Sequence, residues 1–187
     1  MHEPSKLHYT VAKRILRYLQ GTKNLSIRYV KENDSKLIGY TDSDWAGSLD
    51  DRKSTSGYVF YIGSKIIPWS SKKQMTVALS SAEVEYIEAT DGTCEAVWLR
   101  RILSHMEHKE EGSITIFCES MSAIAMSKNP VFHGRTKHIE LRHHFIQDNV
   151  QKGEIQLEFV NTNEQLADIM TKVVPTKKFL QFVMTGT

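Results

Sequence analysis

The stretch GYVFYIGSKIIPWSS predicts a β-hairpin. Apolar, aromatic and β-branched residues fill two runs, 57–62 and 65–70, which are separated by Gly63 and Ser64. Two such runs joined by a two-residue turn are typical of hairpin strands. Because Pro68 has no backbone N–H, we expect the second strand at a sheet edge or with a bend there. A lone hairpin is barely stable in water, so further strands or a helix must cover it.

Hydrophobic periodicity supplies these further elements. Leaving out an N-terminal helix and strand, the predicted order is β-β-β-α-β-α-α-β-α. Three strands joined by short turns, followed by strands joined through helices, predict an α/β fold with a mixed five-stranded sheet and helices packed on it. The elements expected outside the hairpin are a helix over 5–19, strands over 25–30 and 36–42, a helix from 81 to about 104, a strand over 113–118, helices over 120–128 and 137–153, a strand over 155–160 and a helix over 164–172.

Composition narrows the classes of protein that the chain can belong to. Its 187 residues carry a net charge of +2, so a nucleic acid would have to be held by local clusters of Lys and Arg. Cys94 and Cys118 form no spaced pair, which argues against a disulfide scaffold and favours a reducing compartment. There is no apolar run of membrane-spanning length and no signal-peptide pattern. We therefore expect no membrane partner and a cytoplasmic protein, with access to the nucleus left open. The three tryptophans are expected in the core.

Several carboxylates fall at the ends of predicted elements. Asp42 closes the first strand of the sheet, Glu119 directly follows a later strand, and Asp168 lies in the last helix. Glu83 and Glu85 lie in the first turns of the long helix. Such carboxylates can converge at one end of an α/β sheet, where oxygen ligands favour Mg²⁺ or Mn²⁺. Two ions about 4 Å apart can clamp the attacking and leaving oxygens of a phosphodiester. Spacing alone favours ordinary surface acids over a metal site.

Longer motifs point in one direction. The stretches YTDSDWAG, DDRKSTSGYVFYIG, WSSKKQMTVALSSAEVEY, FCESMSAIAMSKNPVFHGRTKHIELRHHFI and ADIMTK occur in this order between about residues 37 and 172. Together they resemble the ribonuclease H domain of copia-type retrotransposon polyproteins. The preceding SKLHYTVAKRILRYLQGTKN resembles the end of the reverse-transcriptase region of such polyproteins. The resemblance implies a reverse-transcriptase remnant over 1–35, a ribonuclease H-like domain over 36–174 and a C-terminal tail over 175–187.

The resemblance also implies a metal site. In this family four carboxylates hold two Mg²⁺ or Mn²⁺ ions, and the motifs assign Asp42, Glu119 and Asp168 to three of them. The motifs favour Asp42 over Asp44 as the metal ligand. Asp44 is then either an acidic turn residue or a residue that supports the ligands.

The fourth carboxylate comes from the long helix, where two residues compete. Ser80 and Glu83 fit a capping box, which gives Glu83 a structural role. Glu85 is then the expected ligand, and it matches the family glutamate that precedes an apolar residue. Thr162 and Gln165 form a second candidate capping box, which would place Asp168 in the second turn of its helix.

At one position the chain departs from the family pattern. The family reads Cys-Asp-Asn-x-Ser-Ala where this chain reads CESMSA, so Glu119 stands in place of an aspartate. The extra methylene displaces the carboxylate, and Mg²⁺ demands near-ideal octahedral geometry. A displacement of about 1 Å can cost on the order of 100-fold in rate. We therefore expect strongly reduced or absent hydrolysis with Mg²⁺.

The substrate implied by the resemblance is an RNA–DNA hybrid, whose RNA strand is hydrolysed. The reverse-transcriptase region of the same polyprotein is the implied protein partner. The competing interpretation is a catalytically inactive nucleic-acid-binding remnant of the same fold. Short basic stretches could contact phosphates, although simple solubility explains each of them as well. The candidates are Arg52, Ser71, Lys72, Lys73, Arg135 and Lys137.

Overall fold

The predicted mixed five-stranded sheet is confirmed in the structure, a computed structural model. Its strands are ordered β3-β2-β1-β4-β5. β1 pairs antiparallel with β2, and β2 with β3, whereas β4 runs parallel to both β1 and β5. β3 is an edge strand, in agreement with the proline at position 68. The strands are β1 (Leu37–Asp44), β2 (Thr55–Ile62), β3 (Lys65–Lys73), β4 (Ile114–Cys118) and β5 (Ile155–Phe159).

Helices accompany the sheet in the part of the chain that the structure describes, which is residues 3–27, 29, 31, 36–48, 50–75, 80–108, 110–129 and 140–185. Within these residues, no helix combines the length and apolar character that crossing a bilayer requires. The helices are α1 (Lys6–Thr22), α2 (Ser81–His105), α3 (Met121–Lys128), α4 (Glu140–Gln151), α5 (Asp168–Thr171) and α6 (Thr176–Thr185).

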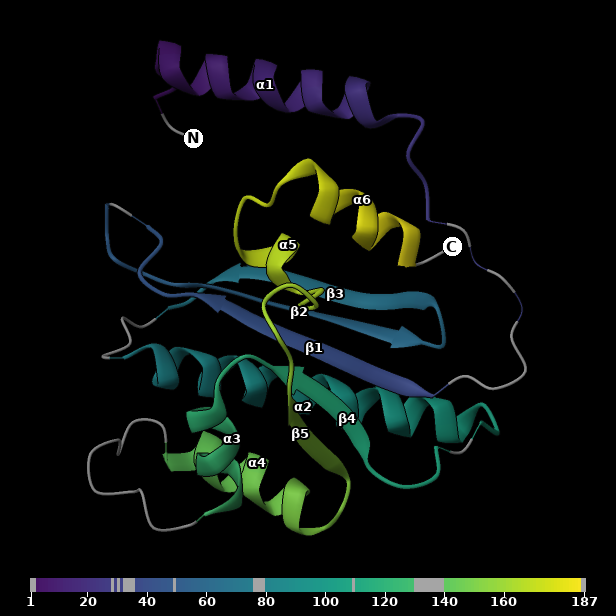
Figure 1. Cartoon of the computed structure of the whole chain (residues 1–187). Helices are drawn as coiled ribbons and strands as arrows, with labels where there is room; N and C mark the ends of the chain where they lie inside the picture. Colours follow the sequence, from purple (N-terminus) through teal and green to yellow (C-terminus); the bar gives the residue numbers. More distant parts are fainter. Residues whose placement is uncertain are drawn as a thin grey trace.

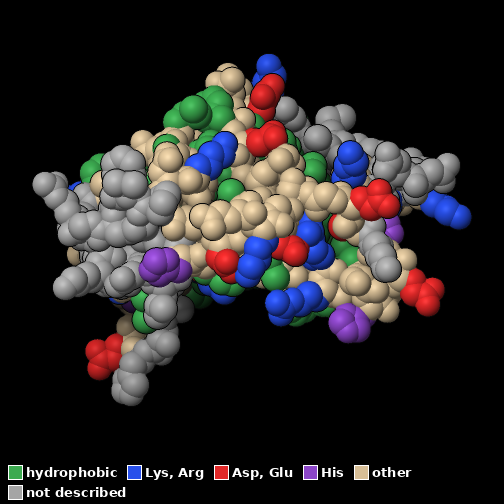
Figure 2. Space-filling model, turned by 90° about the horizontal axis from the view of Figure 1, so that it is seen from below, with side chains coloured by type: hydrophobic (Ala, Val, Ile, Leu, Met, Phe, Trp, Pro, Cys, Tyr) green, Lys and Arg blue, Asp and Glu red, His purple; other side chains and the backbone are tan. Residues whose placement is uncertain are grey.

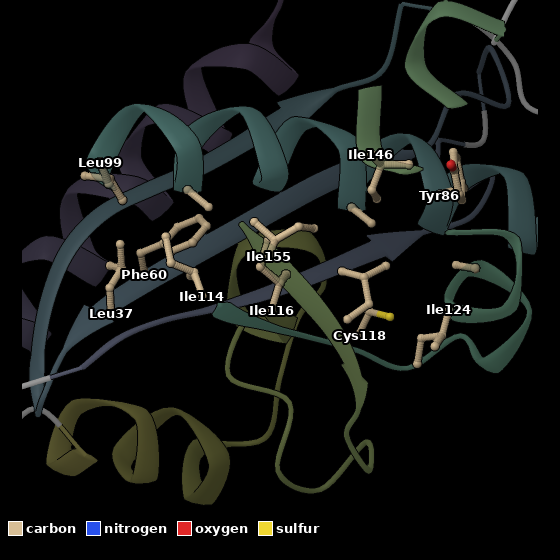
Figure 3. Close-up of a cluster of buried hydrophobic side chains, with 14 residues drawn as sticks. Leu37, Phe60, Tyr86, Leu99, Ile114, Ile116, Cys118, Ile124, Ile146 and Ile155 are labelled. Atoms are coloured by element: carbon tan, nitrogen blue, oxygen red, sulfur yellow. The ribbon is translucent and has the colours of Figure 1, made fainter. Parts of the chain in front are cut away.

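The helices lie on both faces of the sheet. Figure 1 shows α2, α3 and α4 on one face, α5 and α6 on the other, and α1 beyond α6. The larger hydrophobic core fills the space between α2 and the sheet, where Phe60, Ile116 and Ile146 are fully buried (Figure 3). A smaller core on the opposite face contains Tyr61 of β2 and Phe182 of α6. The predicted C-terminal tail therefore contains a helix that packs on the sheet.

Two glycines let helices approach the end of β1 closely. A Cβ atom at Gly92 of α2 would lie 2.6 Å from Cγ2 of Thr41. A Cβ atom at Gly57, which pairs with Asp42, would lie 2.5 Å from Cβ of Met170 in α5. Real Cβ atoms do not approach other heavy atoms this closely, so larger residues would force both helices away from the strand end.

The predicted strand over 25–30 is wrong for the residues described there. Residues 25–27 and 29 belong to no strand. The segment packs through side chains instead, because Ile27 lies against the smaller core and the Tyr29 hydroxyl donates a hydrogen bond to the Ile66 carbonyl at 2.7 Å. Alternating apolar residues thus anchor an irregular connection here and do not add a strand to the sheet.

The expectation of buried tryptophans is also wrong. Trp45, Trp69 and Trp98 are 52%, 62% and 54% exposed. Trp69 lies on the edge strand β3, and Trp98 lies on α2 among neighbours that are buried. The cores are filled by aliphatic residues, Phe and Tyr, so an aromatic residue in an apolar stretch was insufficient to predict burial.

The first prediction concerns Gly92. Alanine normally stabilises a helix interior by about 1 kcal/mol relative to glycine. We expect Gly92→Ala to destabilise this protein instead, by about 1–3 kcal/mol, because the new methyl group overpacks against Thr41. Urea unfolding followed by circular dichroism measures the change.

Thr41→Ser provides the matched background, since it removes the Thr41 methyl group and keeps the hydroxyl that donates to the Phe117 carbonyl. In this background Gly92→Ala should cost little or become stabilising. A Gly92→Ala variant of the original sequence that is as stable as the parent would contradict the close approach of α2 to β1.

Candidate metal centre

Parallel pairing brings the first two carboxylates to one edge of the sheet. Tyr40 of β1 pairs with Phe117 of β4, and Asp42 and Glu119 each follow two residues later. Asp168, the first residue of α5, completes the group. One carboxylate oxygen from each of the three acids lies within 4.8 Å of the others. The structure thus gathers three of the four acids that the motifs single out.

The fourth candidate ligand, Glu85 of α2, is not among the described acids whose carboxylate oxygens lie within 4.8 Å of one another, but it lies near enough to interact with them electrostatically. Burial first, and then the negative charges of Asp42 and Glu119, raise the pKa of Glu85 to about 8. Of the capping box predicted for the competing residue, the structure shows the Ser80 half, in which Ser80 Oγ accepts a hydrogen bond from the Glu83 backbone N–H at 3.2 Å. The charges of Asp42 and Glu119 therefore act on Glu85, whereas Ser80 caps the start of the helix at Glu83.

Asp44, the alternative to Asp42, is the last residue of β1 and pairs with Thr55 of β2. Its carboxylate lies over Gly47, where an added Cβ atom would be 2.0 Å from Oδ2 of Asp44. Among the described residues, the group of acids close enough to share a metal ion contains Asp42 and not Asp44.

The cluster is electrostatically costly without cations. Burial raises the pKa of Asp42, and the Asp168 charge adds to this effect. Burial and the charges of Asp42 and Asp168 likewise raise the pKa of Glu119. Like charges that share a poorly solvated site favour protonation, so positive charge placed there favours the ionised carboxylates.

Two lysines supply positive charge at this point. Lys172 Nζ lies 2.8 Å from Oδ1 of Asp168 and 3.5 Å from Oδ2 of Asp42. Burial alone lowers the pKa of Lys172, but its hydrogen bond to Asp168 and the charge of Asp42 raise it to about 12. Lys178 of α6 pairs with Oδ2 of Asp168 from the other side. Sequence reasoning had assigned neither lysine to the site, although Lys172 closes the ADIMTK motif.

Side-chain hydrogen bonds hold the segment before α5 in place. The capping box predicted for Thr162 and Gln165 is wrong, because α5 has no side-chain cap. Gln165 is fully buried, donates to the Thr41 carbonyl at 3.0 Å and accepts from the Ala167 N–H at 3.1 Å. The Thr162 hydroxyl donates to Oε2 of Glu119 at 3.1 Å. The helix begins only at Asp168, so these two residues connect the segment to β1 and to Glu119.

The Thr171 hydroxyl binds the carboxylate of Asp42 directly. It can reach Asp42 because Gly57 of β2 leaves room for α5, where an added Cβ atom would lie 3.0 Å from Cγ2 of Thr171. A residue without a side chain on β2 thus contributes to the arrangement of the carboxylates.

Glu88 is a buried carboxyl near the site that sequence reasoning missed. It is 2% exposed, and burial, with smaller contributions from Asp91 and Asp42, raises its pKa to about 8. It lines a pocket of about 380 Å³ together with Gln74 and Lys72. Glu88 follows Glu85 by three residues and therefore lies on nearly the same face of the helix. This spacing is the sequence feature that could have indicated a position near the site.

The donor set fits a hard divalent cation. Within the described residues, Oε2 of Glu85 and Oε1 of Glu119 are buried without a hydrogen-bond partner. All candidate ligands are carboxylate oxygens, which Mg²⁺ and Mn²⁺ prefer.

Two of the predicted nucleic-acid contacts are engaged within the protein. The Ser71 hydroxyl donates to the Met170 carbonyl at 2.5 Å and so connects β3 to α5. Lys73 Nζ lies 2.8 Å from Oδ1 of Asp51, and its hydrogen bond holds the pKa of Asp51 low, at about 2. The Ser71 hydroxyl and the Lys73 ammonium group therefore already have partners within the protein.

The remaining basic candidates differ in position. Arg52 is exposed in the loop between β1 and β2, and Lys72 is exposed at the mouth of the 380 Å³ pocket. Arg135 and Lys137 lie outside the described residues. Figure 2 shows that acidic and basic side chains are interspersed over the face formed by α2, α3 and α4, as the low net charge suggests.

Comparisons with known proteins identify relatives. No family model matches the chain. It is 42% identical over 157 residues to the retrovirus-related Pol polyprotein from transposon RE1 of Arabidopsis thaliana, and 44% identical over 158 residues to that from transposon TNT 1-94 of Nicotiana tabacum. Each match covers 84% of this chain, but only 11% and 12% of the two polyproteins. The chain thus corresponds to a small part of these relatives.

Solved structures agree on the fold. The N-terminal RNase H domain of rv2228c from Mycobacterium tuberculosis matches with a TM-score of 0.53 at 16% identity, over 82% of this chain and 99% of that one. LC11-RNase H1 in complex with an RNA/DNA hybrid matches with a TM-score of 0.51 at 12% identity, over 73% of this chain and 94% of that one. The chain therefore belongs to the retrovirus-related Pol polyproteins of copia-type transposons, and the domain it contains has the ribonuclease H fold.

Proposed function

We propose that this domain is a metal-dependent nuclease that hydrolyses the RNA strand of RNA–DNA hybrids. The observation that carries the proposal is the convergence of Asp42, Glu119 and Asp168, with Glu85 beside them, at one edge of the sheet. Two Mg²⁺ or Mn²⁺ ions bound there would supply an activated water and charge stabilisation for in-line displacement at phosphorus. The four carboxylates would hold the ions, and Thr171 would orient Asp42 through its hydroxyl.

The proposed substrate follows from the family and from the fold neighbour that was solved with an RNA/DNA hybrid. Among the described residues we propose Arg52 and Lys72 as phosphate contacts, because both are exposed. Ser71 and Lys73 contribute less directly, since they already bind Met170 and Asp51. Arg135 and Lys137 complete the proposed set. In an intact polyprotein, residues 1–35 would join the domain to the reverse-transcriptase region.

Glu119 is proposed to limit the rate. Its Oε2 is held by Thr162, while its Oε1 is buried without a hydrogen-bond partner. The longer side chain therefore has one oxygen drawn toward the segment before α5. This favours slow hydrolysis with Mg²⁺, and in the limiting case a domain that binds hybrids without cleaving them.

The second prediction tests this limitation. We expect Glu119→Asp to raise the rate of hybrid cleavage with Mg²⁺ by about 10–100-fold, because the shorter side chain restores the ligand position. With Mn²⁺ in place of Mg²⁺, the cleavage rates of the parent and of Glu119→Asp should differ less. Cleavage of a labelled RNA strand within an RNA–DNA hybrid measures the rates.

Asp42→Asn serves as the control and should abolish cleavage by both forms. Equal rates for Glu119 and its aspartate variant would overturn the proposed limitation. If neither form cleaves but both bind the hybrid, the inactive binding module is the correct interpretation.

The third prediction concerns pH. In the metal-free protein the pKa of Glu85 is about 8, whereas an unfolded glutamate has a pKa of about 4.3. Between these values the folded state binds more protons than the unfolded state, so the free energy of unfolding falls as pH rises. Urea unfolding with a chelator present should give a lower free energy of unfolding at pH 8.5 than at pH 5.5. In the Glu85→Gln variant, the difference between the two pH values should be smaller.

Glu111→Gln, at an exposed position, is the matched control. Its free energy of unfolding should depend on pH as that of the original sequence does. Added Mg²⁺ should restore stability at pH 8.5, because cation binding favours the ionised carboxylates. An identical pH dependence for Glu85→Gln and the parent would show that Glu85 is not part of the coupled cluster.

A further inference from the structure

Lys178 joins α6 to the carboxylate cluster. Its side chain is 18% exposed, and its ammonium group binds both Oδ2 of Asp168 and the backbone carbonyl of Thr162. The same Thr162 donates its hydroxyl to Oε2 of Glu119 at 3.1 Å. One lysine thus contacts Asp168 directly and Glu119 through a single intervening residue.

The two carboxylates need such support because their own backbone fixes them weakly. Asp168 begins a helix of four residues that has no side-chain cap. Glu119 follows the last residue of β4 and has a longer side chain than the family aspartate. Lys178, by contrast, extends from a ten-residue helix that is anchored in the smaller core by buried Phe182.

We propose that Lys178 is a positioning residue, which holds Asp168 directly and Glu119 through Thr162 in the arrangement that divalent cations require. The inference rests on the metal site of the proposed function, but not on turnover. It makes α6 part of the metal centre, although this helix provides no carboxylate ligand.

Electrostatics alone would give the opposite effect. A positive charge beside a cation site repels the metal ion, so a lysine that acted only as a counter-ion would weaken metal binding. Removing it would then raise the affinity. A positioning lysine predicts a loss, since residues that orient metal ligands typically contribute 10–100-fold to affinity. The sign of the change therefore separates the two roles.

The fourth prediction is measured by titrating the full chain with Mn²⁺ in a calorimeter. We expect Lys178→Met to lower Mn²⁺ affinity by about 10-fold or more. Lys178→Arg should retain most of the affinity, because it keeps the charge and the donors. Lys177→Met, at the exposed neighbouring position, should leave affinity unchanged. Equal or higher affinity for Lys178→Met would overturn the proposal.

Thr162→Val provides a second route should Lys178→Met fail to fold. It removes the hydroxyl that binds Glu119 and leaves the carbonyl that binds Lys178. We expect a smaller loss of Mn²⁺ affinity than for Lys178→Met, because Lys178 still binds Asp168. Unchanged affinity in Thr162→Val would overturn the link to Glu119.

The two proposals fail in different ways. A parent chain that binds Mn²⁺ but leaves RNA–DNA hybrids intact contradicts the nuclease and retains the role of Lys178. A parent chain that binds no Mn²⁺ at millimolar concentration overturns both.

Discussion

Negative charges forced together in a poorly solvated place repel one another, and the end of β1 is built around this repulsion. Asp42, Glu85 and Glu119 all have raised pKa values there, with burial as the first cause. Lys172 and Lys178 offset part of the charge, while buried carboxylate oxygens still lack partners. A chain does not retain such a costly group for stability, because replacing buried ion pairs with apolar residues is often neutral or stabilising. The cost is better explained by a use for concentrated negative charge.

The rest of the architecture delivers these charges to one place. Parallel pairing of β1 with β4 aligns two strand ends, and α5 adds Asp168 from the opposite face. From the larger core, α2 places Glu85 near enough for the charges of Asp42 and Glu119 to raise its pKa. Close approach of both helices depends on Gly92 and Gly57, where any side chain would collide. Rigid packing over the sheet thus fixes groups that would otherwise separate.

The strands of the mixed sheet and their order along the chain could be predicted because each strand carries its own local signal, such as the apolar runs on either side of Gly63-Ser64. The acids could be named because they end elements and match family motifs. Local patterns could not reveal contacts between distant segments. Thr162 and Gln165 look like a cap in sequence, yet they bind Glu119 and β1. Glu88 is buried by the fold and not by its neighbours in the chain. The stretch around Ile27 alternates like a strand but has no strand partner among the described residues.

Helix α1, which is described along its whole length, contributes no buried side chain. Its apolar residues Leu7, Val11 and Leu19 are 70%, 49% and 56% exposed. Packing therefore places little constraint on this segment, whereas the strands are held to their pattern by two cores. Substitutions on this helix are therefore expected to disturb the sheet little. The exposed apolar residues of α1 leave a hydrophobic surface that the described part of the chain does not cover.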